Sequence, residues 1–323
     1  MVKFSEETDF MPEICVDIEC DNDCLFCAVG GEYSKRFPKK SLKDIKKELK
    51  ELRTVGNNIR ITGGEPTIRG DITEIVSYAK RLDFNQISIE TNGRKLSNEK
   101  FLKKIMKAGA NHFFVSIHGQ NAKIHERVTR APGSFKETIK GIENISKNKI
   151  HFGINVVITR FNYKHLPEIV RFLRKMTDGY ITLNFITVHG STLLSKKIVP
   201  PISETVPYIK RAINSLDNDN AISIGHISFC FLGDYINYSN FVRLPFVTKI
   251  VNPTFTLTLE SHLDRAIQRS EKCKKCRFVK FCRGLWEEYA KIYGYGELKP
   301  VLGKRIETLE ELKYVMDSAK GRG

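Results

Sequence analysis

Three cysteines near the start of the chain have a spacing that suits iron–sulfur chemistry. Cys20, Cys24 and Cys27 read C-x3-C-x2-C. Thiolates on one short loop can bind three irons of a four-iron, four-sulfur (4Fe-4S) cluster, whereas binding all four irons from the protein takes a fourth cysteine. The spacing therefore predicts a 4Fe-4S cluster with one open iron. We expect these three cysteines to be its ligands and the centre of catalysis.

A glycine-rich loop follows a predicted strand further along the chain. Gly63, Gly64 and Glu65 come directly after the apolar run 59–62, which is typical of a buried strand. Together with the cysteine spacing, this loop resembles the radical S-adenosylmethionine (SAM) superfamily. The resemblance implies that the open iron binds the amino and carboxylate groups of SAM. It also implies that the loop after the second strand helps to hold the amino group.

The resemblance implies a mechanism as well. An external one-electron donor of the flavodoxin or ferredoxin type reduces the cluster, and the electron breaks a carbon–sulfur bond of SAM. The products are methionine and a 5′-deoxyadenosyl radical. The protein has to exclude water and hold a substrate C–H bond close to the radical, since so reactive a species attacks whatever is nearest.

Several further residues are predicted to bind SAM, and each has a structural alternative. A glutamate between glycines and a proline suits a backbone that approaches a ligand closely, so we expect Glu65 to contact SAM rather than only to lie beside a helix cap. The resemblance places Phe26 near the adenine, where the alternative is core packing. It places Ser116 and Asn155 at the ribose or the methionine moiety, where the alternative is hydrogen bonding at strand ends.

Glu90 ends the third predicted strand, and we expect it to face the ribose, the substrate or solvent. The resemblance implies an arginine for the SAM carboxylate where this chain has Thr129, so Arg127 or Arg130 has to serve, and Arg130 is preferred. His118 and His125 are predicted to be structural rather than catalytic acids or bases.

Strands and helices alternate up to residue 190. We expect strands at 13–19, 59–62, 86–90, 112–117, 151–159 and 180–188, and helices at 41–52, 72–82, 97–108, 134–147 and 165–175, with Ser41, Ser97 and Ser134 as N-caps. This α/β alternation predicts a parallel sheet with right-handed crossovers. It resembles the partial (β/α)6 TIM-like barrel of the superfamily. In such barrels the reactive groups gather at the carboxyl ends of the strands. The loop 20–27 and residues 63–65, 90–93, 116–119 and 160–162 fall there.

A second group of cysteines lies near the carboxyl end of the chain. Cys273, Cys276 and Cys282 read C-x2-C-x5-C, which resembles the auxiliary-cluster extensions called SPASM and twitch domains. The match is partial, because Trp286 stands where a SPASM pattern has a further cysteine. Cys230 would supply the fourth thiolate of a second 4Fe-4S cluster. If Cys230 is not a ligand, that cluster keeps an open iron, and a structural zinc site is the other alternative.

The sequence divides into two units. We expect a radical SAM core barrel over 1–190 and a smaller α+β cluster-binding domain over 191–323. The second unit is predicted to hold a helix at 203–215, strands at 222–231 and 254–260 that can pair with each other, and a C-terminal helix at 306–319.

Net charge and hydropathy limit the classes of partner that the protein can bind. The formal net charge is +16 at pH 7 and the pI is ≈ 9.4, which permits an RNA, nucleotide or acidic-peptide partner, although lysines spread over the surface explain it equally well. No apolar run approaches the roughly 20 residues that span a bilayer, and no leader opens the chain. The cysteine groups suit metal binding in a reducing compartment. We therefore expect no membrane partner and a cytoplasmic location.

The sequence predicts the cofactor better than the substrate. Auxiliary-cluster relatives mostly act on peptides or protein side chains, so a peptide or protein substrate is the first prediction. A nucleotide or tRNA is the alternative, favoured by the charge and by four aromatics that can stack bases: Phe229, Phe231, Tyr235 and Tyr238. A non-catalytic electron carrier or RNA-binding protein is the third hypothesis, but it leaves the loop 63–65 without a purpose.

Overall fold

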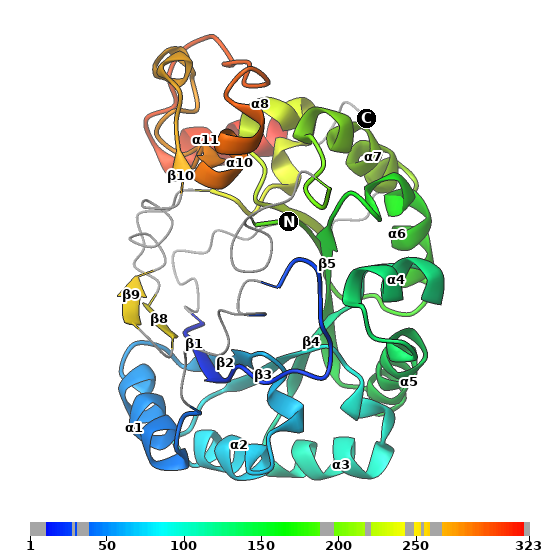
Figure 1. Ribbon diagram of the computed structural model, residues 1–323. Helices are drawn as coiled ribbons and strands as arrows, with labels where there is room; N and C mark the ends of the chain where they lie inside the picture. The colour runs from blue at the N-terminus through cyan, green and yellow to red at the C-terminus, as the bar shows by residue number, and fades with distance from the viewer. Residues whose placement is uncertain are drawn as a thin grey trace.

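The computed structural model describes residues 11–27, 30, 39–187, 197–216, 221–242, 249–252, 255–258 and 267–319. Its centre is one sheet with the strand order β7-β6-β5-β4-β3-β2-β1-β8-β9. The first seven strands run parallel: β1 Glu13–Asp17, β2 Asn58–Gly63, β3 Gln86–Thr91, β4 His112–Ser116, β5 His151–Ile158, β6 Ile181–Phe185 and β7 Ile222–Gly225. Figure 1 shows these strands as an arc with helices around its outside.

Helices follow the strands and cover the outer face of the sheet. They are α1 Leu42–Arg53, α2 Ile72–Arg81, α3 Glu99–Ala108, α4 Ala122–Thr129, α5 Ser134–Lys147, α6 Leu166–Arg174 and α7 Ile202–Asn214. On the other side of β1, the parallel strand β8 (Lys249–Asn252) and the antiparallel strand β9 (Phe255–Thr258) extend the sheet. Within the described residues β7 and β9 remain the two edges, so the barrel is partial and open, as predicted.

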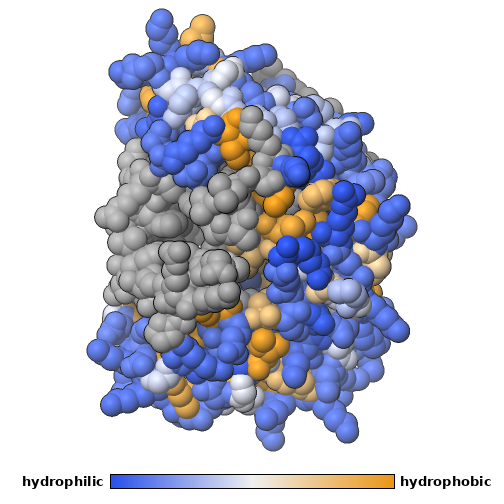
Figure 2. Space-filling view, in the orientation of Figure 1, coloured by the Kyte–Doolittle hydropathy of each residue, from blue (hydrophilic) through white to orange (hydrophobic). Residues whose placement is uncertain are grey.

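The alternation of side chains along each strand separates the core from the barrel interior. On β5, Ile154, Val156 and Ile158 are fully buried against the helix layer, whereas Asn155 and Val157 point the other way because successive side chains alternate. The helices pack on the sheet through apolar stripes. In α1 the buried stripe consists of Ile45, Leu49 and Leu52, at helical spacing. Figure 2 shows mostly hydrophilic residues around the edge of this face, with hydrophobic residues mainly toward its middle.

The predicted elements are confirmed, but several of their ends are wrong. The first strand ends at Asp17 instead of residue 19, because Asp17 Oδ1 accepts hydrogen bonds from the backbone N–H groups of Ile18 and Glu19 and turns the chain. Ser97 does not cap α3; it ends a short 3-10 helix, and Asn98 Oδ1 accepts from Phe101 N at 3.1 Å instead. Ser134 is the first residue of α5 rather than its cap.

Ser41 does cap α1, since it accepts a hydrogen bond from the N–H group of Asp44. Helix α4 was not predicted from the sequence. This helix is capped by Asn121, whose side chain accepts from Ile124 N.

The two strands predicted for the second unit do not pair with each other. The strand predicted at 222–231 is only β7, which pairs with β6 and becomes a seventh parallel strand of the barrel. It ends where Gly225 is followed by His226 at φ 65°, and the four-residue helix α8 (Phe229–Leu232) follows. The strand predicted at 254–260 is β9, which pairs with β8. The sheet therefore extends past residue 190.

The remaining elements form a small unit that joins the main core through Leu285, Trp286 and Tyr289 and also contributes to a second, smaller core. They are the antiparallel pair β10 (Ile267–Gln268) and β11 (Leu285–Trp286), α10 (Glu287–Tyr293) and α11 (Leu309–Ser318). A capping box of Thr308 and Glu311 starts α11 three residues later than predicted. Buried side chains of this unit include Phe278, Leu312 and Met316. None of the helices among the described residues is long and apolar enough to cross a bilayer.

Candidate active site

A cavity of about 350 Å³ lies at the carboxyl ends of the parallel strands. Nine of the residues predicted for the site line it: Cys20, Cys24, Phe26, Cys27, Gly63, Gly64, Glu90, Ser116 and Asn155. Ten other residues complete the wall: Asn22, Thr62, Thr91, Asn92, His118, Val157, Asn184, Phe185, Thr187 and His226. The cavity thus unites loops that are far apart in sequence, as the barrel topology predicts.

The three cysteines of the loop 20–27 (the cluster loop) face this cavity together. Desolvation, with smaller contributions from Glu65, Asp21 and Cys27, raises the pKa of the Cys20 thiol to about 12. Burial likewise raises the pKa of Cys24, with additions from Cys20 and Cys27. Thiols that raise one another's pKa suit a bound cation, because a metal ion stabilises the thiolates.

Gly30 leaves room for the last of these cysteines. A Cβ atom at Gly30 would lie 2.9 Å from Cys27 Cβ and 3.0 Å from Cys27 Sγ, closer than side chains tolerate. Gly30 therefore lies tight against Cys27. The donor set and this tight approach fit an iron–sulfur cluster on three thiolates.

Gly63 and Gly64 pack against the strand that leads into the cluster loop. A Cβ atom at Gly63, whose φ is 153°, would lie 2.1 Å from the backbone oxygen of Asp17, and one at Gly64 would lie 2.3 Å from that of Glu19. Gly64 N donates to Asp17 O at 2.8 Å and Glu65 N to Glu19 O at 2.7 Å. The close approach expected from these glycines is therefore, in this structure, an approach to β1 and the start of the cluster loop.

Glu65 lies behind the cavity wall and is 1% exposed. Its Oε1 accepts from Thr67 N at 3.0 Å, Thr67 Oγ1 at 2.6 Å and Thr91 Oγ1 at 2.7 Å, and its Oε2 accepts from Asn92 N at 2.6 Å. Burial raises the pKa of Glu65, and these donors oppose the shift. The structure shows the helix-cap role, at the short 3-10 helix Pro66–Ile68. The predicted contact with SAM stays a prediction.

Glu90 is the carboxylate on the cavity wall. Burial raises its pKa to about 7, Arg60 opposes the shift, and Glu13 adds to it. Arg60 Nη1 donates to Glu13 Oε1 at 2.9 Å, and the guanidinium lies 5.2 Å from the centre of the Phe114 ring. Arg60 thus pairs with the half-buried Glu13 and also favours the ionised form of Glu90, and of these two carboxylates only Glu90 lines the cavity.

The titration of Glu90 should make the free energy of unfolding depend on pH. Because its folded pKa is raised, Glu90 contributes stability that is fully present below about pH 4.5 and is lost as pH rises through about 7. Relative to wild type, Glu90→Gln should therefore gain stability on going from pH 5 to pH 8, by at most about 1.4 kcal/mol per pH unit. Urea unfolding at both pH values measures this. An equal difference between the two proteins at pH 5 and pH 8 would contradict it.

Polar side chains from three adjacent strands form one wall. Asn155 Nδ2 lies 3.5 Å from Ser116 Oγ, and Asn184 Nδ2 donates to Asn155 Oδ1 at 2.9 Å. Ser116 and Asn155 are direct neighbours in the sheet register. Asn184 was not among the residues predicted for the site. Its signal was an amide in the otherwise apolar end of the strand predicted at 180–188.

His118, which lies on the cavity wall, and His125 behind it support these side chains. His118 Nδ1 accepts from Val157 N at 3.2 Å, and His125 Nδ1 accepts from His118 N at 3.1 Å. The two rings stack with centroids 5.7 Å apart, and Phe26 meets His118 edge-on at 4.7 Å. Burial lowers the pKa of both histidines, for His125 to about 4. Both are neutral at pH 7 and form part of the packing.

These histidines predict acid sensitivity. A group with a depressed folded pKa contributes stability that is present above its unfolded pKa of about 6.5 and is lost as pH falls toward about 4. His125→Asn keeps an acceptor for His118 N but cannot titrate, so it should lose less stability than wild type between pH 7 and pH 5. The difference should be at most about 1.4 kcal/mol per pH unit. Urea midpoints measure it, with His151→Asn, an exposed histidine, as the control. Equal losses in wild type and His125→Asn would contradict it.

Arg130 contacts the back of the cluster loop and is not on the cavity wall. It ends α4 in the left-handed conformation, φ 54°. Its Nε donates to Asp23 O at 2.6 Å, and its Nη2 forms an ion pair with the Asp23 carboxylate. Arg127 stacks on Phe161 at 4.3 Å from the ring centre. The assignment of Arg130 to the SAM carboxylate stays a prediction.

Residues 19–173 match the model of the radical SAM superfamily. The chain carries a radical SAM domain. That domain contains the three cysteines, the loop 63–65 and most of the cavity wall.

Three curated relatives show how far the sequence similarity reaches. 7,8-Dihydro-6-hydroxymethylpterin dimethyltransferase of Methanocaldococcus jannaschii is 26% identical over 66% of this chain and 43% of its own length. AdoMet-dependent heme synthase of Methanosarcina barkeri is 28% identical over 58% and 53%. A probable GTP 3′,8-cyclase of Saccharolobus islandicus is 28% identical over 59% and 62%. The matched region thus spans 43 to 62% of the length of these relatives.

Solved structures share a fold with most of this chain, beyond the residues matched by the radical SAM model. Streptococcus suis SuiB bound to S-adenosylmethionine has a TM-score of 0.65 at 15% identity, covering 88% of this chain and 74% of its own. Native anSMEcpe with bound AdoMet has a TM-score of 0.63 at 15% identity, covering 96% of this chain and 98% of its own. At these identities the likeness concerns the fold alone.

The second group of cysteines lies outside the radical SAM match and lines one small space. Cys230, Cys273, Cys276 and Cys282 border a cavity of about 20 Å³, together with Ser228, Arg269, Val279, Gly284, Leu298 and Pro300. Burial raises the pKa of Cys230 to about 12, and Cys282, Cys276 and Cys273 add to the shift. Among the described residues, neither cysteine group has three side chains already in the arrangement that would hold a metal ion. The structure does bring Cys230 to the other three, which are at least 43 residues away in sequence.

Proposed function

We propose that this chain cleaves SAM reductively in the cavity at the strand ends and uses the 5′-deoxyadenosyl radical to abstract hydrogen from a substrate. One observation carries the proposal. Cys20, Cys24 and Cys27 face the same cavity as Gly63, Gly64, Ser116 and Asn155, the residues that the family resemblance assigns to SAM. A 4Fe-4S cluster bound there supplies the electron that cleaves SAM.

The wall residues have distinct tasks in this proposal. The backbone at Gly63 and Gly64 is fixed against β1, so it offers a rigid edge to the methionine end of SAM. Ser116, Asn155 and Asn184 offer hydroxyl and amide groups to the ribose or the methionine moiety. Phe26 and Phe185 supply apolar surface that helps to exclude water from the cavity. Reduction calls for a one-electron donor, for which we propose a protein of the flavodoxin or ferredoxin type.

We further propose that the four-cysteine cavity binds a second 4Fe-4S cluster within the unit 191–323. Because Cys230 lines the cavity with the other three, four thiolates are available and a closed cluster is favoured over one with an open iron. A zinc ion on four cysteines is the alternative.

A peptide or a protein side chain is the substrate class we propose. The support is a whole-chain likeness in fold: anSMEcpe, which matches 97% of this chain, has also been solved with bound AdoMet and the Kp18Cys peptide, and SuiB with its precursor peptide SuiA. The aromatics that favoured a nucleotide are used in packing. Phe229 is 1% exposed, and Phe231, Tyr235 and Tyr238 pack half-buried against the main core.

A nucleotide substrate is the second candidate, because a probable GTP 3′,8-cyclase is among the sequence relatives. Binding of tRNA or GTP to the reconstituted protein, measured at several salt concentrations, separates the two classes. Many phosphate contacts give a steep loss of affinity with salt, whereas a peptide enzyme shows weak binding and a shallow dependence.

Anaerobic reconstitution tests the proposal directly. Iron, sulfide and zinc are counted per chain, dithionite and SAM are added, and 5′-deoxyadenosine is measured by chromatography. About eight irons with 5′-deoxyadenosine would support both clusters. About four irons plus one zinc would keep the enzyme and make the second site a structural one. Iron without any 5′-deoxyadenosine would overturn the proposed activity.

A further inference from the structure

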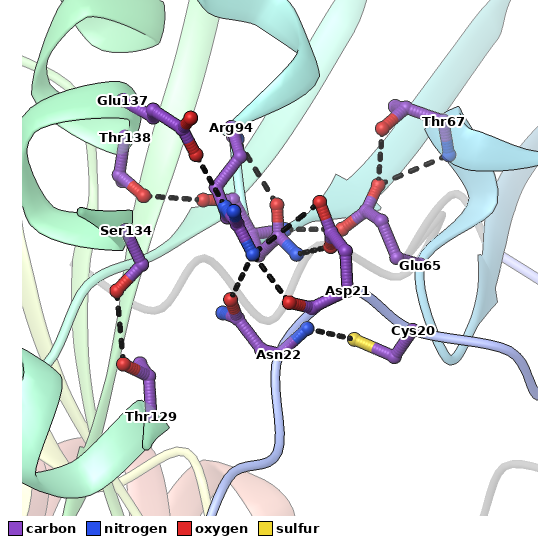
Figure 3. A network of polar contacts seen from close by, with 12 residues as sticks. Cys20, Asp21, Asn22, Glu65, Thr67, Arg94, Thr129, Ser134, Glu137 and Thr138 are labelled. Carbon is purple, nitrogen blue, oxygen red and sulfur yellow. Dashed lines mark hydrogen bonds and ion pairs between the residues drawn. The ribbon is translucent and has the colours of Figure 1, made fainter. Parts of the chain in front are cut away.

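Arg94 lies just after β3, between the cluster loop and α5, and points at the loop from outside the cavity (Figure 3). Its Nη1 donates to Asn22 Oδ1 at 2.9 Å and also to the backbone oxygen of Asp21. Its Nε donates to Glu137 Oε2 at 2.5 Å. The Arg94 side chain is 17% exposed. One half-buried guanidinium therefore joins three segments of the barrel.

Asn92 holds the same loop from the neighbouring position. Its Nδ2 donates to Asp21 Oδ1 at 2.6 Å, and its Oδ1 accepts from Arg94 N at 3.0 Å. Its backbone oxygen accepts from Thr138 Oγ1 at 2.8 Å. The end of β3 is thus fixed on α5 on one side and on Asp21 on the other, as Figure 3 shows for Asp21, Arg94 and Thr138.

These contacts lead to a cysteine sulfur. Asn22 N lies 3.4 Å from Cys20 Sγ and donates to it. Arg94 holds the side chain of Asn22 by a hydrogen bond to Asn22 Oδ1. The direction of the backbone N–H group of Asn22 therefore depends on Arg94. Groups that hydrogen-bond a metal ligand fix its orientation and tune the metal. Arg94 also balances the carboxylate of Asp21, which is adjacent to Cys20 in sequence.

We propose that Arg94 is a positioning residue for the iron–sulfur cluster: by gripping Asp21 and Asn22 it holds Cys20 in the orientation that binds iron. The inference rests on the proposed function for the identity of the cluster. Two contributions can be separated. The planar fork of arginine sets the geometry of the loop, and its positive charge offsets Asp21 beside the cluster. Lysine keeps only the charge, and glutamine keeps neither.

Three full-length variants test this against wild type: Arg94→Gln, Arg94→Lys and the control Arg171→Gln. Arg171 forms one ion pair with Glu168 at 3.3 Å, and both side chains are about half exposed, at 48% and 49%. Each reconstituted protein is exposed to a ferrous chelator. Loss of total iron and loss of the SAM-sensitive EPR signal are followed over time. The reduction potential of that signal and the melting temperature of the iron-free protein complete the comparison.

Arg94→Gln should lose the SAM-sensitive cluster at least about tenfold faster than wild type. Removing a residue that hydrogen-bonds around a metal ligand usually weakens metal binding by about this factor. Its potential should shift to more negative values, because a positive charge near the cluster is gone. Arg94→Lys should release iron faster but keep a potential near that of wild type. Arg171→Gln should match wild type in both.

Equal release rates and potentials in Arg94→Gln and wild type would overturn the inference. A lower melting temperature of iron-free Arg94→Gln with an unchanged release rate would also overturn it, since Arg94 would then support only the fold. Absence of any SAM-sensitive signal in wild type would count against the proposed function instead. In that case the release of total iron still compares Arg94→Gln with wild type and decides the inference.

Discussion

Cys24→Ala is expected to abolish 5′-deoxyadenosine formation. Cys24 is one of three thiols that face the main cavity, and its pKa is raised by burial and by Cys20 and Cys27. Two remaining thiolates cannot hold a cluster that needs three protein ligands. The variant should lose about four irons per chain relative to wild type after reconstitution. Iron analysis and chromatography of the reaction products measure both effects.

Cys15→Ala is the matched control for this experiment. Cys15 lies in β1 and is 7% exposed, and its Sγ contacts the backbone oxygen of Asp17 at 3.4 Å. It lines neither of the two cysteine-lined cavities. The variant should keep its iron and its activity. Full activity of Cys24→Ala, or loss of iron in Cys15→Ala to the same extent, would contradict the assignment of the cluster to the loop 20–27.

The barrel could be predicted because its signals are local and repeated. Each strand is a short apolar run with β-branched residues, and each helix has an apolar stripe, as in the Ile45, Leu49 and Leu52 series of α1. Parallel connection then follows from the alternation, and the position of the site follows from the parallel sheet. The nine wall residues were predicted independently, from the cysteine spacing and the family resemblance, and the topology places them at this one site.

The sequence could not show where strands find their partners across long gaps. β7 has only four residues, and nothing in them distinguishes pairing with β6 from pairing with the later strand. Asn184 was missed for a related reason. A single amide in an apolar strand is informative only when its neighbour across the sheet, here Asn155, is known.

Charged residues were the hardest to assign. The residues next to Arg130 and Arg94 form no motif that indicates a partner. From the sequence, either arginine could face a ligand or the protein itself. In the structure both grip the backbone of the cluster loop, Arg130 at Asp23 and Arg94 at Asp21. Which partner a guanidinium takes depends on loops that are far apart in sequence, so spacing alone carries no signal for it.

Glu65→Ala is expected to destabilise the protein strongly and to weaken SAM binding, while the iron content stays nearly intact. The carboxylate accepts four hydrogen bonds, from Thr67 N, Thr67 Oγ1, Thr91 Oγ1 and Asn92 N. Alanine leaves these buried donors without an acceptor, at a cost of roughly 3 kcal/mol or more. Glutamine should fall between, since it keeps one oxygen and turns an N–H group toward Asn92 N.

This experiment also separates the two roles considered for Glu65. A cap acts through Asn92, whose side chain holds Asp21 in the cluster loop, so its loss should lower the urea midpoint and the SAM affinity together. A direct SAM ligand would lower the affinity alone. Glu74→Ala is the control, because the Lys46–Glu74 pair at 2.6 Å has the Glu74 side chain 53% exposed and should contribute at most about 1 kcal/mol. A urea midpoint for Glu65→Ala as high as that for Glu74→Ala would rule out the cap as the main role, and calorimetric SAM affinities of both variants complete the test.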